Sequence, residues 1–356
     1  MPSLWPAFAA GAASGRKLRI LFLGGTGFLG PHTVRAALEC GHELTLFNRG
    51  KTAPDMFADL EHLRGDRDGD LGALAGKRWD AVIDTSGYVP RIVTDSASLL
   101  ADAVGQYVFI STISVYASSA EPGMDESAPL ATLADKTVEE ITGETYGPLK
   151  ALSEQAAERA MPGRVTVIRP GLIVGPGDET DRFTYWPVRV ARGGEVLAPG
   201  KPDTPVQFID VRDLGAWIVH CLEARVLGRY NALSPAGEHS MGELLETCRD
   251  ASGNEARFTW VPADFLAAQG IAPWSDMPMW LPPAGDYAGS GLMSAAKAVA
   301  AGLRFRPLES TAADTLAWWR NERGGEAELR AGIDAKREQA VLAAWHAHEK
   351  AGDSAK

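Results

Sequence analysis

The chain has little cysteine: Cys40, Cys221 and Cys248 are the only three in 356 residues, and they lie far apart. An odd number of widely spaced cysteines provides neither a disulfide framework nor the close ligand pairs of a zinc site. The composition therefore favours a reduced, cytoplasmic compartment and predicts no metal site.

Basic blocks and long hydrophobic runs are also missing. The net charge is −11, and Lys and Arg nowhere form the basic stripe that a sequence-independent nucleic-acid binder needs. The apolar runs are much shorter than the roughly 20 residues that cross a bilayer. The expected partner is therefore a small molecule, with no nucleic acid and no membrane.

The start of the chain is rich in Ala and Gly but lacks the positive charge that precedes the apolar part of an export signal. We expect a disordered extension over residues 1–16. An eroded export signal is the alternative.

Short apolar runs alternate with longer helical stretches from residue 17 onward. Strands buried on both faces are apolar almost throughout, and runs of this kind occupy residues 17–24, 42–48, 79–86, 106–112 and 164–170. A helix is expected over 29–40, between the first two runs. The alternation predicts an α/β fold with a parallel sheet covered by helices on both faces.

A glycine-rich turn, "GGTGFLG", directly follows the first predicted strand and opens the first predicted helix. Such a turn lets the backbone approach a pyrophosphate and directs free helix N–H groups at its charge. The pattern predicts a dinucleotide site that includes Gly24, Thr26, Gly27, Phe28, Leu29 and Gly30.

The end of the second predicted strand bears on the choice of cofactor. NAD-binding folds normally present an acidic side chain there to the ribose hydroxyls, whereas this chain has Asn48, Arg49 and Lys51. A cation pairs well with a 2′-phosphate, so NADP is favoured over NAD, unless Arg49 only faces solvent. Asp66, after a third predicted strand, is expected either at the adenine edge or as a turn former.

Tyr146 and Lys150 stand four residues apart in "YGPLK", which puts both side chains on one face of a predicted helix that begins near Tyr146. A phenol has a pKa near 10 in water, and a neighbouring ammonium favours its ionised form. The pair predicts proton transfer to or from a carbonyl or alcohol.

The motifs "GGTGFLG", "GDRD", "FISTISVY", "YGPLK", "IRPGLIVGPGD" and "FIDVRD" occur in this order over residues 17–320. In these the chain resembles an extended or atypical member of the short-chain dehydrogenase/reductase superfamily, the NAD-dependent epimerase/dehydratase family. The resemblance implies a Rossmann-type doubly wound parallel sheet with a smaller C-terminal substrate lobe. We expect a dinucleotide-binding domain over 17–170, a mixed substrate lobe over 171–323 with segments that return to the sheet, and a helical tail over 324–356.

The resemblance also implies roles for single residues. Thr112 takes the position of the catalytic hydroxyl, with Ser111 as its rival. Tyr146 is the implied acid/base, Lys150 binds the nicotinamide ribose and lowers the pKa of the tyrosine, and the backbone after Pro170 lies beside the nicotinamide. Because members of the family commonly form dimers, the resemblance further implies a homodimer.

Two departures from the family pattern limit the reactions and substrates that are expected. Family dehydratases carry an Asp–Glu pair directly after the catalytic Thr, where this chain has Ile113 and Ser114. Many nucleotide-sugar enzymes of the family carry an Asn where this chain has Leu172. Dehydration is therefore not expected, and a diphosphate-linked substrate is not favoured.

The predicted substrate residues are Tyr116, Asp178, Arg182, Trp186 and Trp280. Arg182 is expected to hold a carboxylate or phosphate, or to form a surface ion pair with Asp178 or Asp181. The loop around Trp280 is expected to cap the pocket, or to pack in the core of the smaller lobe.

Together these observations predict an NAD(P)-dependent oxidoreductase that moves hydride between the nicotinamide and a carbinol or ketone carbon of a small polar substrate. An epimerase that works through a transient keto intermediate with tightly bound cofactor is one alternative. A non-catalytic dinucleotide-binding sensor is another.

Overall fold

The computed structural model describes residues 16–354 and divides into two compact units. Of the described residues, the first unit holds 16–110, Ser153–Val167 and Gly215–Gly228, and the second holds Ser111–Leu152, Ile168–Leu214 and 229–354. The extension expected over 1–16 lies outside the described residues except for residue 16, and the domain boundaries expected from the sequence stay a prediction.

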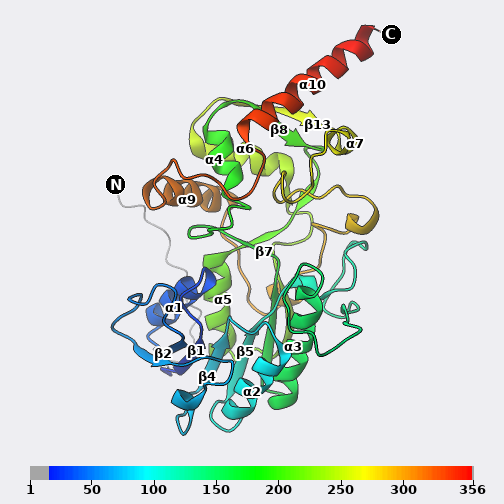
Figure 1. Cartoon of the computed structure of the whole chain (residues 1–356). Helices are drawn as coiled ribbons and strands as arrows, with labels where there is room; N and C mark the ends of the chain where they lie inside the picture. Colours follow the sequence, from blue (N-terminus) through cyan, green and yellow to red (C-terminus); the bar gives the residue numbers. More distant parts are fainter. Residues whose placement is uncertain (1–15, 355–356) are drawn as a thin grey trace. The chain divides into compact units, whose positions relative to one another are not determined.

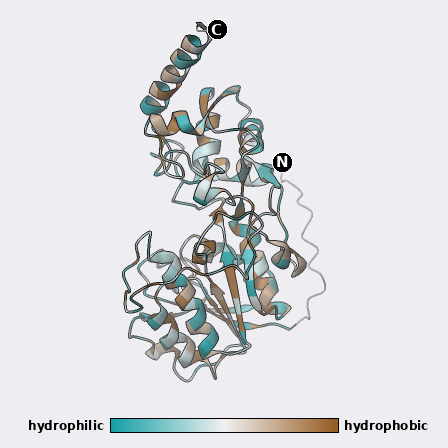
Figure 2. Cartoon of the chain, turned by 90° about the vertical axis from the view of Figure 1, so that its right-hand side faces the viewer, coloured by the Kyte–Doolittle hydropathy of each residue, from teal (hydrophilic) through white to brown (hydrophobic). Residues whose placement is uncertain are grey.

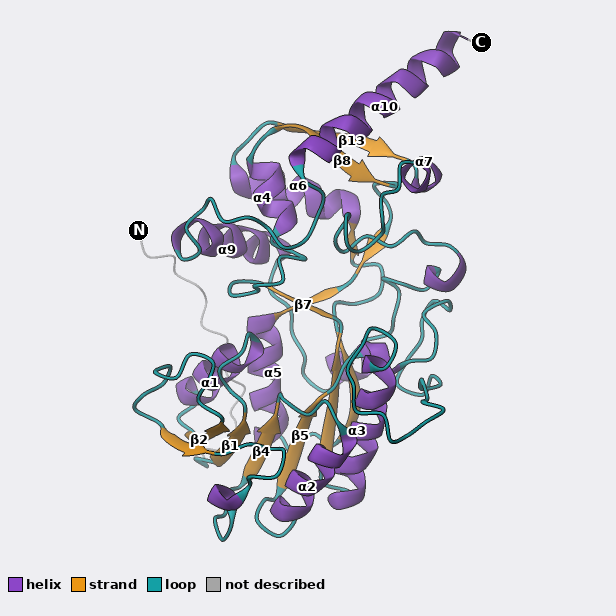
Figure 3. Ribbon diagram, viewed as in Figure 1, coloured by secondary structure: helices purple, strands orange, loops and turns teal. Residues whose placement is uncertain are grey.

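A seven-stranded sheet has the order β3–β2–β1–β4–β5–β6–β11 (Figure 3). The strands are β1 (Arg19–Leu23), β2 (Glu43–Asn48), β3 (Glu61–Arg64), β4 (Ala81–Asp84), β5 (Gln106–Ile110), β6 (Val165–Pro170) and β11 (Gly228–Ala232). The pairs β1–β2, β2–β3, β1–β4 and β4–β5 are parallel. The order reverses direction beside β1, as in doubly wound dinucleotide-binding folds, and this confirms the predicted Rossmann-type α/β fold.

The core of the first unit forms where the sheet meets its helices. The helices beside the sheet are α1 (Leu29–Glu39), α2 (Pro90–Leu100), α3 (Tyr146–Ala160) and α5 (Val211–Glu223), with a short 3-10 turn η1 (Gly72–Leu74) (Figure 1). The first turns of α3 and α5 belong to the second unit. Strands β4 and β5 are buried along their whole length, and the central strands are largely hydrophobic in Figure 2. Side chains such as Leu21, Val82 and Phe109 pack with Val93 and Ala97 of α2.

The second unit contains shorter elements joined by long loops. They are η2 (Ile113–Val115), β7 (Leu172–Val174), α4 (Tyr185–Ala191), β8 (Gly194–Pro199), β9 (Pro205–Val206), β10 (Phe208–Asp210), β12 (His239–Ser240), α6 (Met241–Ser252), β13 (Ala256–Val261), α7 (Ala263–Ala268), η3 (Gly285–Tyr287), α8 (Ala296–Ala300), α9 (Leu308–Asn321) and α10 (Ala335–Ser354). Its hydrophobic core contains three large aromatic side chains, Phe183, Trp186 and Trp280, that are fully or almost fully buried.

Residues 16–354 contain neither a candidate membrane span nor a candidate metal cluster. No helix there has the length and apolar character needed to cross a membrane. No group of three or more His, Cys, Asp or Glu side chains there is arranged to hold a metal ion.

A buried ionic cluster built from the "FIDVRD" motif ties β10 to α9. Both carboxylate oxygens of Asp210 accept from the Arg212 guanidinium, at 2.9 and 2.7 Å, and one also accepts from the Thr311 hydroxyl at 2.8 Å. Arg306 bonds the neighbouring Asp213 at 2.8 Å and lies 3.5 Å from Asp210. Burial by itself would raise the pKa of Asp210, but the bonds from Arg212 and the charge of Arg306 hold that pKa below its usual value.

We expect Asp210→Asn to lower the free energy of unfolding at neutral pH by about 3 kcal/mol, because it removes a buried carboxylate that bonds Arg212 and attracts Arg306. A carboxylate with a lowered folded-state pKa stabilises above its unfolded-state pKa and loses that effect as the pH falls through the folded value. Denaturant titrations of both proteins from pH 7 downward should therefore show the difference shrinking. Asp203→Asn, at an exposed position of the same unit, is the control. If the difference in the free energy of unfolding between wild type and Asp210→Asn does not change with pH, the Asp210 carboxylate does not stabilise the fold through its charge.

Candidate functional site

The glycine turn between β1 and α1 needs its glycines for two different reasons. Gly24 and Gly25 have φ of +109° and +93°, where side-chain-bearing residues are strained. At Gly30 a Cβ would lie 2.4 Å from the backbone carbonyl carbon of Gly25, so the turn closes on itself only without a side chain. Gly25 was not among the predicted residues, although the Gly–Gly pair was a signal for it.

The same turn leaves room for a ligand at its outer side. A Cβ built at Gly27 meets no atom within 4 Å, and no side chain caps the start of α1. Helix starts carry unpaired N–H groups and a positive dipole end. The turn that holds the six predicted residues therefore fits the pyrophosphate of a dinucleotide.

Asn48 links the end of β2 to this turn. Its amide nitrogen donates to the carbonyl oxygen of Gly24 at 3.1 Å, and its amide oxygen accepts from the Gly50 N–H at 2.9 Å and from Arg64 at 2.5 Å. Both ends of the amide are thus engaged in holding the strand end and the turn together.

Two guanidinium groups lie at the ends of β2 and β3. Arg49 is exposed, and its guanidinium lies 4.0 Å from the Asp66 carboxylate. Arg64, also exposed, bonds Asn48 and packs against the backbone of Gly50. Sequence reasoning identified Arg49 but missed Arg64, because only the pairing of β2 with β3 brings it beside Asn48.

The residue after Asp66 anchors that loop to the sheet. Arg67 is buried and donates to Asp84 at 2.6 Å and to the hydroxyl of Ser96 at 2.7 Å. Tyr107 donates to the other oxygen of Asp84 at 2.6 Å. A buried ion pair with both partners bonded in this way holds its loop in one position.

The second unit brings the predicted proton-transfer residues together. Thr112 follows β5, and its hydroxyl lies close enough to the phenol of Tyr146, the first residue of α3, to lower the pKa of that phenol. The same hydroxyl oxygen accepts from the Ser114 N–H at 3.1 Å, which fixes its position. Lys150 lies one helical turn further along α3 and is only 2% exposed.

The electrostatic environment of Tyr146 keeps its phenol protonated. Burial raises the pKa of Tyr146, while the hydrogen bond from Thr112 and the positive charge of Arg182 act in the opposite direction without cancelling the increase. In the ligand-free chain the tyrosine is therefore a proton donor.

Gly147 allows α3 to begin against the turn that carries Thr112. A Cβ at this position would lie 2.0 Å from the carbonyl oxygen of Ser114 and 3.0 Å from its carbonyl carbon. Sequence reasoning did not single out Gly147. A glycine within a predicted helix was the available signal.

Tyr116 has its hydroxyl bonded within a buried network. It donates to Asn231 at 2.6 Å and accepts from Arg169 at 3.0 Å, while the Arg169 guanidinium also stacks over its ring. Arg169 precedes Pro170, the last residue of β6. The network holds the end of β6, and substrate contact by Tyr116 stays a prediction.

Asp178 and Arg182 do not form the ion pair that was one of the expectations for Arg182. The nearest hydrogen-bond partner of both is Thr180, which donates to Asp178 at 2.7 Å and accepts from the Arg182 Nε at 3.0 Å. Asp181 instead is fully buried and bonds Arg323.

The two predicted substrate tryptophans lie in the core of the second unit. Trp186 is fully buried and donates to the carbonyl oxygen of Pro278 at 2.8 Å. Trp280 is 1% exposed and packs against Gly200. Neither ring offers surface to solvent, and their contact with a substrate stays a prediction.

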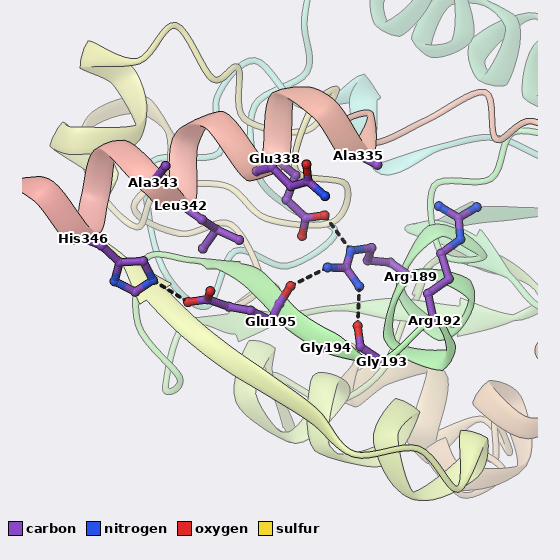
Figure 4. Close-up of a pocket in the computed structure, with 11 residues that line it drawn as sticks. Arg189, Arg192, Gly193, Gly194, Glu195, Ala335, Glu338, Leu342, Ala343 and His346 are labelled. Carbon is purple, nitrogen blue, oxygen red and sulfur yellow. Dashed lines mark hydrogen bonds and ion pairs between the residues drawn. The ribbon is translucent and has the colours of Figure 1, made fainter.

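A pocket of about 500 Å³ lies between the end of α4, the start of β8 and α10 (Figure 4). Arg189 bonds Glu338 of α10 at 2.6 Å and the carbonyl oxygens of Gly193 and Glu195. His346 lies 2.7 Å from the Glu195 carboxylate. These polar groups satisfy one another and fasten α10 to β8. The pocket contains none of the predicted site residues.

Comparison with known proteins gives consistent matches. A model of the family described as "NAD dependent epimerase/dehydratase family" matches residues 20–232. The epimerase family protein SDR39U1 of Bos taurus is 27% identical over 274 residues, which cover 71% of this chain and 86% of the relative.

Solved structures share the fold. The Bordetella bronchiseptica enzyme WbmG, in complex with NAD and UDP, has a TM-score of 0.64 at 18% identity and covers 90% of this chain and 100% of its own. The human epimerase family protein SDR39U1 with NADPH has a TM-score of 0.56 at 22% identity, covering 83% and 98%.

We expect Gly147→Ala to lower the free energy of unfolding by about 1–3 kcal/mol, because the new methyl group overlaps the Ser114 carbonyl. Glycine to alanine in a helix otherwise stabilises by up to about 1 kcal/mol. Gly352→Ala in α10, where a Cβ meets nothing within 4 Å, is the matched control. Denaturant unfolding measures the change for each variant. Equal changes in the free energy of unfolding for Gly147→Ala and Gly352→Ala would argue against the close approach at Gly147.

Proposed function

Because the chain belongs to the NAD dependent epimerase/dehydratase family, we propose that it is an NADP-preferring oxidoreductase. It moves hydride between the nicotinamide and a carbinol or ketone carbon of a small polar substrate. The observation that carries this proposal is the placement of the Thr112 hydroxyl near the Tyr146 phenol, with Lys150 buried one turn along the same helix.

The proposed roles follow the position of each group. The glycine turn binds the pyrophosphate, and Lys150 binds the nicotinamide ribose, as in the family. The nicotinamide, when bound, supplies or accepts the hydride. Thr112 donates a hydrogen bond to the substrate oxygen, and Tyr146 transfers the proton to or from that oxygen.

The proton on Tyr146 suits the reductive half of this chemistry. A phenol whose pKa is raised holds its proton at neutral pH, and a ketone that accepts hydride needs a proton on its oxygen. Oxidation requires the phenolate, which the charge of Lys150 and of an oxidised nicotinamide would favour.

The preference for NADP is supported by Arg49 and Arg64, whose guanidinium groups lie at the ends of neighbouring strands β2 and β3. A 2′-phosphate can accept from both. The related human protein is described with NADPH and the Bordetella enzyme with NAD. A cytoplasmic location and a homodimer, both expected from the sequence, complete the proposal.

Tyr146→Phe should lower turnover by about 10²–10⁴-fold, since it removes the proton donor, and should leave NADPH affinity nearly unchanged. Absorbance of the reduced nicotinamide measures turnover in a screen of sugars and small ketones, with Tyr287→Phe, at an exposed tyrosine, as the control. A variant that retains turnover would refute the role of Tyr146. Isomerisation of a sugar with tightly bound cofactor and no net absorbance change would identify an epimerase instead.

Arg49→Met should weaken NADPH binding by about 10- to 100-fold, the effect of losing charged hydrogen bonds, and leave NADH binding unchanged. Arg64→Met should act in the same direction. Calorimetric titration measures both constants, with Arg159→Met, an exposed arginine of the same unit, as the control. Equal losses for the two nucleotides would show that Arg49 and Arg64 do not recognise the 2′-phosphate.

A further inference from the structure

The positive charge of Arg182 is available to bind an anionic ligand. No acidic side chain among residues 16–354 forms an ion pair with it, although two aspartates are close in sequence. Asp181 is fully buried, bonds Arg323 and accepts from the Arg330 N–H at 2.9 Å. Asp178 accepts from the backbone N–H and the hydroxyl of Thr180.

The guanidinium is oriented by one hydrogen bond that leaves its outer edge open. Its Nε donates to the Thr180 hydroxyl oxygen at 3.0 Å, and Thr180 in turn donates to Asp178 Oδ1 at 2.7 Å. Because Nε is used, the donors that remain are the two Nη groups. These form the end of the guanidinium fork, and a carboxylate or phosphate can accept from both at once.

The second carboxylate oxygen of Asp178 is evidence for a ligand that does not depend on Arg182. Asp178 is 1% exposed, and its Oδ2 is buried without a hydrogen-bond partner among the described residues. Burial raises the pKa of this carboxyl. A buried polar atom without a partner is costly, and a ligand hydroxyl would satisfy it.

Arg182 lies near both Asp178 and Tyr146. Its charge acts to lower the pKa of Tyr146 and also that of Asp178. An anion held by Arg182 would therefore lie near the proton donor.

We propose that the substrate is an anionic hydroxy or keto compound, whose carboxylate or phosphate is bound by the two Nη groups of Arg182 and whose hydroxyl donates to Asp178 Oδ2. This inference rests on the proposed function, since it places the anion beside the residue that transfers the proton. It gives the substrate a class: an oxyanion-bearing polyol or keto acid.

The test compares matched compounds on the NADP-loaded full chain: glucuronate, a hexose phosphate and neutral glucose. Calorimetric titration measures binding to the wild type, Arg182→Met, Asp178→Asn and the control Arg192→Met, an exposed arginine of the same unit. We expect the wild type to bind an anionic compound, and Arg182→Met to weaken that binding by about 10- to 100-fold with NADPH affinity unchanged. Comparison of glucuronate with the hexose phosphate shows whether the site prefers a carboxylate or a phosphate.

Absence of anion binding by the wild type, or equal binding by wild type and Arg182→Met, overturns the anion site. Turnover is followed separately with the same compounds and a panel of keto acids. If anions bind through Arg182 but Tyr146→Phe leaves any turnover unchanged, the proposed function fails and the anion site stands. If neutral compounds are turned over as well as anionic ones, the substrate class is wrong and the oxidoreductase stands.

Discussion

The close approach of α3 to the turn after β5 is the contact on which the candidate chemistry depends. Gly147 permits it, since any Cβ there would overlap the Ser114 carbonyl oxygen at 2.0 Å. The approach brings the Tyr146 phenol to the Thr112 hydroxyl and buries Lys150 one turn later. Two backbones in contact cannot move independently, so the geometry of proton transfer is held by packing.

The charged side chains of the chain divide into two groups by what they bond. Arg67 with Asp84, Arg189 with Glu338 and Arg212 with Asp210 are paired and largely buried, and the first two pairs join segments distant in sequence. Arg49 and Arg182 are more exposed and retain donors for a ligand. Charges of the first group hold loops in place, whereas those of the second are available for recognition.

Much of the fold could be predicted because its signals are local. Apolar runs mark strands buried on both faces, and those predicted at 42–48 and 164–170 match β2 and β6 within one residue at each end. The family, predicted from ordered motifs, is confirmed. The parts that could not be predicted depend on pairing across the chain: Arg64 reaches Asn48 only through the β2–β3 ladder, and Trp186 reaches Pro278 across a long loop.

By itself, the sequence determined the α/β class, the glycine turn and the spacing of Tyr146 and Lys150, because these depend on residues that are neighbours in the chain. Only the tertiary structure decided which side chains are already engaged. It bonded both ends of the Asn48 amide, buried Trp186 and Trp280, and left Asp178 Oδ2 without a partner. Hydrogen-bond partners are set by contacts between distant segments, and no local pattern specifies them.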